Sequence, residues 1–359
     1  MSNDLSNVRK RIDSIDEQIQ GLLTERAECA MEVAKIKTAA GDTTFYRPDR
    51  EAQVLQRIKD RNQSLLSDDE MARLFREIMS ACLALEQPTK VAFLGPDGSY
   101  TQSAALKQFG HSANTIPVSA IDEVFREVES DNADYGVVPV ENSTEGMVNH
   151  SMDMFINSPL RICGEVQLRV HHHFLSNEVD LASVKRIYSH QQSFAQCREW
   201  LNLNMPLVER IVINSNSEAA RLASEEKGAA AIAGSIAGEI YKLDSLAKNI
   251  EDNSDNTTRF LVVSKIETGA SGSDKTSLLL STPNKPGALY SLLEPLQRND
   301  VSMTRVESRP SKQGVWEYVF FVDVEGHTSD ANVLKALSEI EESAAMYKVL
   351  GSYPKAVIS

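Results

Sequence analysis

Two cations on an apolar helix face are the first feature of the sequence that indicates a binding or catalytic site. Apolar residues recur at spacings of four and three over residues 8–36, the pattern of a long helix that packs against another helix. Arg26 and Lys37 fall close to that face, and Glu51 and Glu86 fall on the apolar faces of later helices. Because a buried cation is costly unless an anion meets it, the set predicts a pocket for a small dicarboxylate. The alternative is snorkelling side chains or internal salt bridges.

Hydroxyl and amide side chains mark a second candidate site. They fall in four motifs, at residues 95–101, 138–146, 188–197 and 256–260, each beside a predicted strand end. Open α/β sheets bind ligands at such ends, so segments far apart in the chain are expected to meet in one crevice. Taken singly, each motif could equally be a polar turn or a helix cap.

A histidine triplet at residues 171–173 suggests a metal site at first sight. Consecutive residues of a strand point to alternate faces, so the three rings cannot all ligate one ion. We therefore expect no metal and no cofactor.

The elements that must position these residues change in character along the chain. Residues 5–86 are predicted to be helical, with a second helix that begins near Pro48. From Lys90, short buried strands alternate with helices, which is typical of α/β architecture. After a Gly/Ser linker at 268–273, the order strand–helix–strand–strand–helix–strand is that of a ferredoxin-like fold. Pro295 predicts a kink or an early end in the first helix of that fold.

At 359 residues the chain is too long for one ordinary core. We predict a multidomain protein with an all-α helical dimerising domain at residues 1–88, an α/β domain at 89–267 and an α+β ferredoxin-like domain at 274–359. Three helices of such unequal length make a poor core alone. A dimer that shares the long helix is therefore expected.

Charge and cysteine content limit the partners and the compartment. The net charge of −14 argues against nucleic acid or an acidic membrane as a partner. The N-terminus lacks the basic and apolar pattern of a secretory signal, and no uncharged apolar run could span a bilayer. The four scattered cysteines are typical of reduced thiols, so a cytoplasmic protein is expected.

The helical region resembles the all-helical chorismate mutase family, which forms an intertwined dimer. The resemblance rests on the segments 8–16, 25–26, 33–37 and 50–51. It implies that Arg26 and an Arg9 from the partner chain clamp the two carboxylates of chorismate. It also implies that Lys37 contacts a carboxylate and the ether oxygen.

The same resemblance assigns further residues to this site. Glu51 would contact the ring hydroxyl of chorismate, and Glu86 stands where the family often has a glutamine aimed at the ether oxygen. Only a protonated Glu86 could donate there; burial would raise its pKa and the nearby cations would lower it. The remaining residues assigned to the site are Arg47, Arg50 and Cys82.

The polar motifs between residues 90 and 266, taken as an ordered set, resemble prephenate dehydratase. That family has two α/β lobes like those of a periplasmic binding protein, with the substrate between them. The resemblance gives the essential role to Thr258, as a hydroxyl donor in a dry site. Arg259 is either a cation near the cleft or part of a structural ion pair. The other substrate-binding residues are Glu141, Asn142, Ser189 and Gln196.

The C-terminal region resembles the ACT domain of prephenate dehydratases, in which two motifs frame an inhibitory phenylalanine at a dimer interface. The matching effector-binding residues are Asn284, Gly287, Ala288, Leu289, Glu307, Ser308, Arg309 and Pro310. Together the resemblances imply a homodimer or higher homo-oligomer that converts chorismate to prephenate and prephenate to phenylpyruvate, under feedback inhibition by phenylalanine. Two alternatives are a non-catalytic amino-acid sensor and a dehydratase that prefers arogenate.

Overall fold

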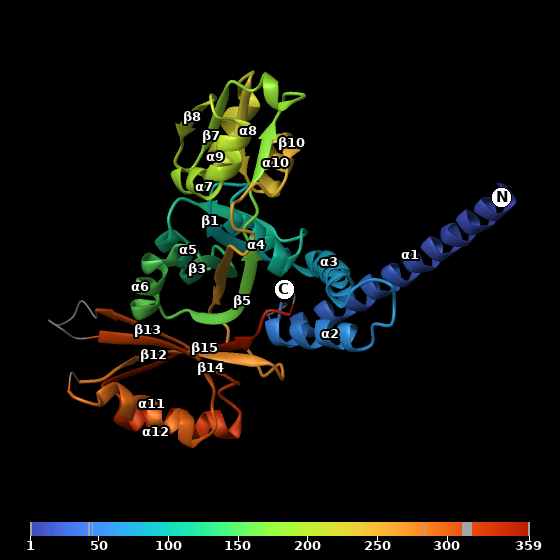
Figure 1. Ribbon diagram of the computed structural model, residues 1–359. Helices are drawn as coiled ribbons and strands as arrows, with labels where there is room; N and C mark the ends of the chain where they lie inside the picture. The colour runs from blue at the N-terminus through green and yellow to red at the C-terminus, as the bar shows by residue number, and fades with distance from the viewer. Residues whose placement is uncertain (1, 42–43, 45, 284, 311–317, 358–359) are drawn as a thin grey trace.

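The computed structural model describes residues 2–41, 44, 46–283, 285–310 and 318–357. They form a helical module, two α/β lobes and a C-terminal α+β module (Figure 1). The predicted fold class, an all-α region followed by two-lobed α/β and ferredoxin-like regions, is confirmed. Within the described ranges, no helix combines the length and the apolar character that a membrane span needs.

The helical module consists of α1 (Ser2–Ala39), α2 (Pro48–Asp60) and α3 (Asp68–Glu86). Proline occupies the first turn of α2, where a missing N–H costs nothing. The Ser67 hydroxyl accepts the backbone N–H of Glu70 at 3.2 Å and so caps α3. Buried Leu55, Ile58 and Ala72 form a small core between α2 and α3.

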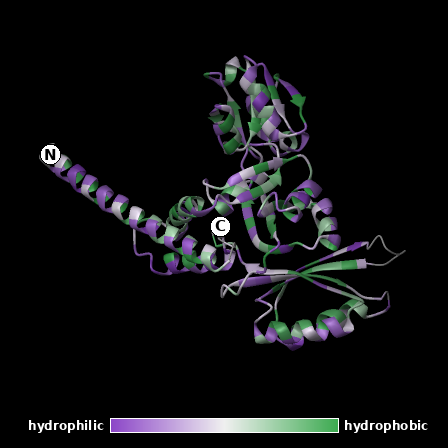
Figure 2. Ribbon diagram, turned by 180° about the vertical axis from the view of Figure 1, so that it is seen from behind, coloured by the Kyte–Doolittle hydropathy of each residue, from purple (hydrophilic) through white to green (hydrophobic). Residues whose placement is uncertain are grey.

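Helix α1 projects away from the rest of the chain (Figure 1). Its apolar seam stays uncovered within one chain, since Val8, Ile12, Ile15, Ile19 and Leu22 are 44–65% exposed. Hydrophilic and hydrophobic residues alternate along this helix (Figure 2). An exposed apolar seam of this kind is typical of helix–helix interfaces.

The first lobe is a sheet in the order β2-β1-β3-β11-β5, with β4 paired to β3. Its elements are β1 (Lys90–Leu94), α4 (Tyr100–Phe109), β2 (Asn114–Val118), α5 (Ile121–Glu129), β3 (Tyr135–Asn142), β4 (Gly146–Met147), α6 (Asn149–Asn157), β5 (Arg161–Arg169) and β11 (Thr257–Ser264). Strand β1 is parallel to β2 and β3, whereas β11 is antiparallel to β3 and β5. The end of β3 therefore meets the beginning of β11, and Asn142 lies opposite Thr258.

The second lobe is inserted between β5 and β11, with the strand order β10-β6-β9-β7-β8. Its elements are β6 (His173–Ser176), a short 3-10 helix (Leu181–Ser183), β7 (Arg186–Ser189), α7 (Gln191–Gln196), α8 (Arg198–Asn204), β8 (Glu209–Val212), α9 (Asn216–Glu225), β9 (Ala229–Ala233), α10 (Ser235–Tyr241) and β10 (Asp244–Ala247). The chain crosses between the lobes at residues 170–172 and again at 248–256. The polar motif at 256–260 and the histidine triplet lie at these crossovers, and the motif at 138–146 pairs with the former motif through Asn142 and Thr258.

The C-terminal module has the sheet order β13-β14-β12-β15. Its elements are β12 (Asp274–Ser281), α11 (Ala288–Arg298), β13 (Met303–Pro310), β14 (Tyr318–Glu325), α12 (Ala331–Ser343) and β15 (Met346–Pro354). The predicted strand–helix order is confirmed. Of the kink or early end expected at Pro295, the early end does not occur, because the helix runs on to Arg298. Both the backbone and the side-chain amide of Asn299 donate to the Pro295 carbonyl, and these bonds close one further turn.

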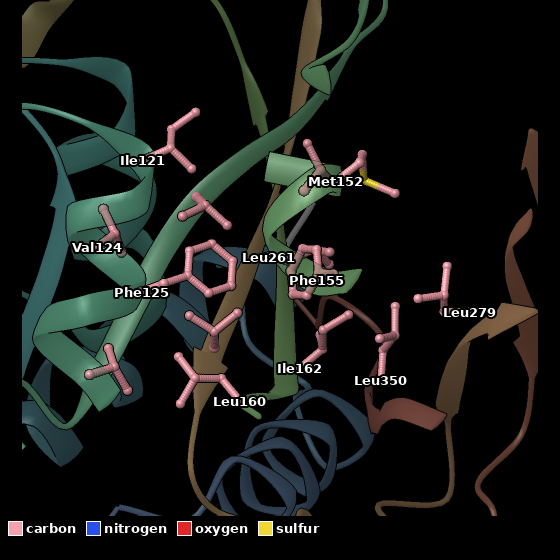
Figure 3. Packing of buried hydrophobic residues seen from close by; sticks show 14 of the residues in the cluster. Ile121, Val124, Phe125, Met152, Phe155, Leu160, Ile162, Leu261, Leu279 and Leu350 are labelled. Atoms are coloured by element: carbon pink, nitrogen blue, oxygen red, sulfur yellow. The ribbon is translucent and has the colours of Figure 1, made fainter. Parts of the chain in front are cut away.

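The first lobe and the C-terminal sheet share one hydrophobic core. Phe155 and Ile162 of the lobe belong to the same cluster as Leu279 of β12 and Leu350 of β15 (Figure 3). Helices α11 and α12 pack against the opposite face of the C-terminal sheet (Figure 1). One face of that sheet therefore acts as an additional layer of the first lobe.

Candidate active sites

The first candidate site is a pocket where the helical module meets the first lobe, here called the helical pocket. Among the residues that line it are the predicted Arg26, Lys37, Arg47, Arg50, Glu51, Cys82 and Glu86. Helix α1 contributes the first two, the start of α2 contributes the next three, and α3 contributes the last two. Cations outnumber carboxylates in this set, which favours an anionic ligand.

Arg9 does not line the helical pocket. It is exposed and lies about five turns before Arg26 on the same straight helix, which corresponds to about 25 Å along the axis. One chain therefore cannot bring Arg9 to its own pocket. Any Arg9 at this site has to come from another chain.

Glu51 is held by a cation that was not predicted from the sequence. Arg76 Nε donates to Glu51 Oε1 at 2.8 Å, and the two side chains are 8% and 11% exposed. Arg76 Nη1 donates to the carbonyl of Lys107 in α4, also at 2.8 Å. The available signal was spacing, because Arg76 is four residues from both Ala72 and Ser80, two small residues on the buried face of α3.

Glu86 lies half-buried at the end of α3. Burial raises the pKa of its carboxyl above the ordinary value, and the charges of Lys37 and Arg26 oppose that rise without reversing it. Lys37 Nζ also donates to the carbonyl of Thr44 at 2.9 Å. Glu86 therefore keeps its proton to a higher pH than an ordinary glutamate does.

The second candidate site centres on Thr258, at the beginning of β11. Asn142 Nδ2 donates to the Thr258 hydroxyl oxygen at 2.8 Å. The amide cannot be turned round, because its Oδ1 accepts the backbone N–H groups of Thr144 and Glu145 at 2.9 and 3.0 Å. The hydroxyl hydrogen of Thr258 meets no acceptor among the residues that the structure describes, so it can be donated to a ligand.

A chain of hydrogen bonds joins this site to the second lobe. Asn142 Nδ2 also donates to Asn256 Oδ1 at 2.8 Å, and Asn256 Nδ2 donates to Gln196 Oε1 at 3.4 Å. Gln196 Oε1 lies 2.8 Å from Nε2 of the buried His172, whose Nδ1 lies 2.8 Å from the Tyr100 hydroxyl. Burial lowers the pKa of His172, so the ring stays neutral at ordinary pH. Within the histidine triplet, His172 thus contributes to the packing between the two lobes.

Two other predicted residues have different neighbours. Ser189 is completely buried at the end of β7, and its hydroxyl donates to Asn216 Oδ1 at 3.1 Å within the second lobe. Glu141 forms an ion pair at 3.4 Å with Arg305 of β13 in the C-terminal module. The structure therefore joins Asn142 to Thr258 directly, Asn256 through Asn142, and Gln196 through Asn256 and Asn142. It places Ser189 and Glu141 in adjoining networks.

Arg259 takes the second of its two predicted alternatives, a structural ion pair. Its guanidinium donates to Glu165 at 3.0 Å, to Asp323 at 2.7 Å and to the Tyr353 hydroxyl at 3.0 Å. Neighbouring residues of a strand point to opposite faces, so Arg259 faces away from the hydroxyl of Thr258. The arginine joins the first lobe to the C-terminal module.

The effector motifs lie at one end of the C-terminal sheet. Gly287, at the start of α11, has a φ of +77°, a left-handed conformation that favours glycine. Ser281 at the end of β12 pairs with Val319, and Val319 pairs with Arg309 of β13. The helix start and the end of β13 are therefore close in the fold. Asn284 lies outside the described residues.

Strand β13 also contacts the first lobe. Arg309 forms an ion pair with Asp153 at 2.9 Å and donates to the carbonyl of Asn149 at 2.6 Å, both in α6. The other effector-motif residues are the buried Ala288, the half-buried Glu307, and the exposed Leu289, Ser308 and Pro310. The predicted effector region is thus tied to the lobe that carries Thr258.

A cation-rich pocket between helices, a polar site between two α/β lobes and a small α+β module define a multidomain enzyme with two separate sites. Three family models match the chain in the same order: chorismate mutase type II over residues 8–87, prephenate dehydratase over 91–268 and the ACT domain over 276–342. The chain belongs to the bifunctional chorismate mutase/prephenate dehydratase family.

Full-length relatives agree with this assignment. The bifunctional chorismate mutase/prephenate dehydratase of Stutzerimonas stutzeri is 53% identical over 99% of both chains. That of Pseudomonas aeruginosa is 52% identical over 99% of this chain and 98% of its own. The crystal structure of prephenate dehydratase from Arthrobacter aurescens in complex with L-Phe has a TM-score of 0.69 and 31% identity, covering 76% of this chain and 91% of that one. The predicted pair of activities, chorismate mutase and prephenate dehydratase, is confirmed.

Proposed function

We propose that chorismate binds in the helical pocket and rearranges there to prephenate. The observation that carries this assignment is the convergence of Arg26 and Lys37 with Glu51 and Glu86 in one pocket. The rearrangement uses no nucleophile and no proton transfer. Catalysis therefore comes from holding the compact conformer and from stabilising the charge that develops on the ether oxygen.

The roles in this pocket follow from the chemistry of each side chain. Arg26 binds a carboxylate of chorismate. Lys37 and protonated Glu86 donate hydrogen bonds to the ether oxygen, and Glu51 accepts a hydrogen bond from the ring hydroxyl. Three further residues complete the wall: Arg47, Arg50 and Cys82. The charge of each group matches the part of chorismate that it meets.

We also propose that two α1 helices pair in a homodimer. The exposed seam of α1 supports this assembly, because apolar burial contributes about 25 cal/mol per Å² and the seam is uncovered in one chain. Pairing along α1 would place Arg9 of the partner subunit at the helical pocket. That arginine would then bind the second carboxylate of chorismate.

The second site, in our proposal, takes prephenate and releases carbon dioxide and water as phenylpyruvate forms. Thr258 donates a hydrogen bond to the leaving hydroxyl, which departs as hydroxide and takes a proton from solvent, while Asn142 holds the Thr258 oxygen in place. Gln196 binds the substrate from the second lobe. Ser189 and Glu141 support the site through their networks, in the second lobe and at β13. Because the reaction is driven by aromatisation, orientation and one well-placed donor are what the protein has to supply.

Phenylalanine is the proposed effector, bound between the start of α11 and the end of β13. The complex of the Arthrobacter protein with L-Phe supports this choice. A ligand shifts an equilibrium only if it binds one state better than the other. Two ion pairs offer a route: Arg305 with Glu141 ties β13 to the residue next to Asn142, and Arg309 with Asp153 ties β13 to α6.

Incubation of the purified protein with chorismate tests the whole proposal. Prephenate should appear first and phenylpyruvate second, and added phenylalanine should slow the second step. Faster turnover of arogenate than of prephenate would assign the second site to the other substrate. Binding of phenylalanine without any turnover would instead favour the non-catalytic sensor.

The cysteines support a cytoplasmic location. All four are free thiols, and Cys82, Cys163 and Cys197 are buried. Burial raises the pKa of Cys163 and Cys197, which keeps them protonated and unreactive. Thiols of this kind are typical of reducing compartments.

Mutase activity is expected to fall on the alkaline side as Glu86 ionises, because only the protonated acid can donate to the ether oxygen. The raised pKa moves this decline to higher pH than an ordinary glutamate would give. Glu86→Gln, whose amide donates at any pH, should show a flatter profile and gain on the wild type as pH rises. The measurement is mutase rate against pH for both proteins, each carrying Thr258→Ala to disable the dehydratase. Profiles of identical shape would show that Glu86 does not act at the ether oxygen.

A further inference from the structure

The helical module docks on the first lobe mainly through α3 and the segment before α2. Tyr46 is central to this contact: its hydroxyl accepts from Gln108 Nε2 at 3.0 Å, and its carbonyl accepts from the Tyr135 hydroxyl at 3.0 Å. Farther out, Glu77 accepts from the His111 backbone N–H at 3.0 Å. The two bonds of Tyr46 hold this residue, and with it the start of α2, against α4 and β3.

Arg76 crosses the same boundary from within the helical pocket. One end of its guanidinium donates to Glu51, and the other end donates to the Lys107 carbonyl in α4. The residue is 7% exposed and therefore has little freedom to move. The position of Glu51 is thus set by a backbone group of the first lobe.

The first lobe also supplies part of the pocket wall. Phe109, the last residue of α4, lines the helical pocket together with Tyr46. The rings of Tyr46, Phe109 and Tyr135 pack in one cluster with centroids 5.0–5.2 Å apart. One wall of the pocket is therefore formed by the dehydratase part of the chain.

We infer that the mutase site is completed across the domain boundary, with Arg76 as a positioning residue that holds Glu51 and is itself held by the first lobe. The inference rests on the proposed role of Glu51 at the ring hydroxyl. It implies that mutase turnover depends on docking of the helical module against α4. Dehydratase turnover does not depend on Arg76, because Thr258 and its neighbours lie at the other end of β3 and β11.

The first test compares two neighbouring residues of α3 in the full-length protein. Arg76→Gln removes the cation at Glu51 and should lower mutase kcat/KM by about 10²-fold, as misplacement of a substrate-binding group does. Arg76→Lys keeps the charge but not the two-armed geometry, so an intermediate value is expected. Glu77→Gln is the matched control, because it weakens an exposed contact between α3 and His111, just past the end of α4 and outside the pocket, and should change neither activity.

The conservative variant and the second activity together separate positioning from general loss of structure. In Arg76→Lys the retained charge should recover part of the mutase kcat/KM that Arg76→Gln loses. Dehydratase kcat/KM should be unchanged in both variants.

The second test pushes the two modules apart. A Cβ added at Gly110 would lie 2.4 Å from Ser80 Cβ and 2.6 Å from Ser80 Oγ, so Gly110→Ala wedges α4 away from α3. Adding Ser80→Gly removes both contacts and leaves the backbone strain at Gly110 unchanged. Mutase activity should fall in Gly110→Ala and recover in the double variant, with Ser80→Gly alone measured as the reference.

The outcomes are distinct. An Arg76→Gln protein with unchanged mutase kcat/KM, or with equal losses in both activities, would overturn the inference. A Gly110→Ala protein whose mutase activity is not restored by Ser80→Gly would also overturn it. Failure of the proposed function would look different, since the wild-type protein would then not convert chorismate at all.

Discussion

Replacement of Thr258 by alanine is expected to lower dehydratase kcat/KM by about 10²–10³-fold, the cost of losing one preorganised donor at a developing charge. The hydroxyl oxygen of Thr258 is occupied by the Asn142 amide, which leaves the hydrogen directed away from that neighbour. Alanine removes the hydrogen and leaves Asn142 Nδ2 with Asn256 as its remaining acceptor. The measurement is phenylpyruvate formation from prephenate.

Thr258→Ser provides the control for this prediction, because serine retains the hydroxyl and loses only a methyl group. It should keep most of the activity that alanine loses. Mutase activity should be the same in both variants and in the wild type, which also shows that they fold. Dehydratase turnover in Thr258→Ala that stays close to the wild-type rate would remove Thr258 from the reaction.

Replacement of Lys37 by alanine is expected to lower mutase kcat/KM by about 10²–10³-fold, since a cation directed at the breaking ether bond is lost. Lys37 lies near the half-buried Glu86, so the loss also removes a charge that opposes the rise in the pKa of Glu86. Dehydratase activity on added prephenate should not change. Arg9→Ala should show a similar mutase defect, although Arg9 lies about 25 Å from the pocket of its own chain.

Mixing these two defective proteins tests the shared site directly. After unfolding and refolding together in equal amounts, about half of the dimers should contain one chain of each kind, by random pairing in a twofold assembly. Each such dimer has one pocket with intact Lys37 and an intact Arg9 of the partner subunit. Mutase activity should therefore return to about one quarter of the wild-type value, as this pairing gives. A mixture as inactive as its components would exclude donation of Arg9 between chains.

Features that depend on local periodicity could be predicted from the sequence. The seam of α1, the start of α2 at Pro48 and the strand–helix order of the C-terminal module all follow from spacing and turn residues. The cations Arg26 and Lys37 could be assigned to one pocket because they lie on a single helix. Helical spacing alone carried that information.

Contacts between distant segments could not be predicted in this way. Arg76 donates to the carbonyl of Lys107, 31 residues farther along the chain. The helical spacing around Arg76 gives no indication of that acceptor. The two alternatives for Arg259 were decided by Glu165 and Asp323, which lie 94 and 64 residues away along the chain. Pro295 was expected to kink α11 or to end it early. The helix runs on to Arg298, and the Asn299 side chain that closes its last turn is also held by Glu339 of α12, 40 residues away.

The shared core of the first lobe and the C-terminal sheet has a consequence for how regulation can be lost. Removing the C-terminal module would uncover Phe155 and Ile162 and would deprive Glu165 of Lys275, which lies 2.8 Å away. A truncated chain would therefore lose the phenylalanine-sensing C-terminal module and, at the same time, much of the stability of the first lobe. Strains that overproduce phenylalanine because they escape feedback inhibition should accordingly carry point substitutions near β13. Nonsense mutations upstream of β12 should instead make the strain require phenylalanine for growth.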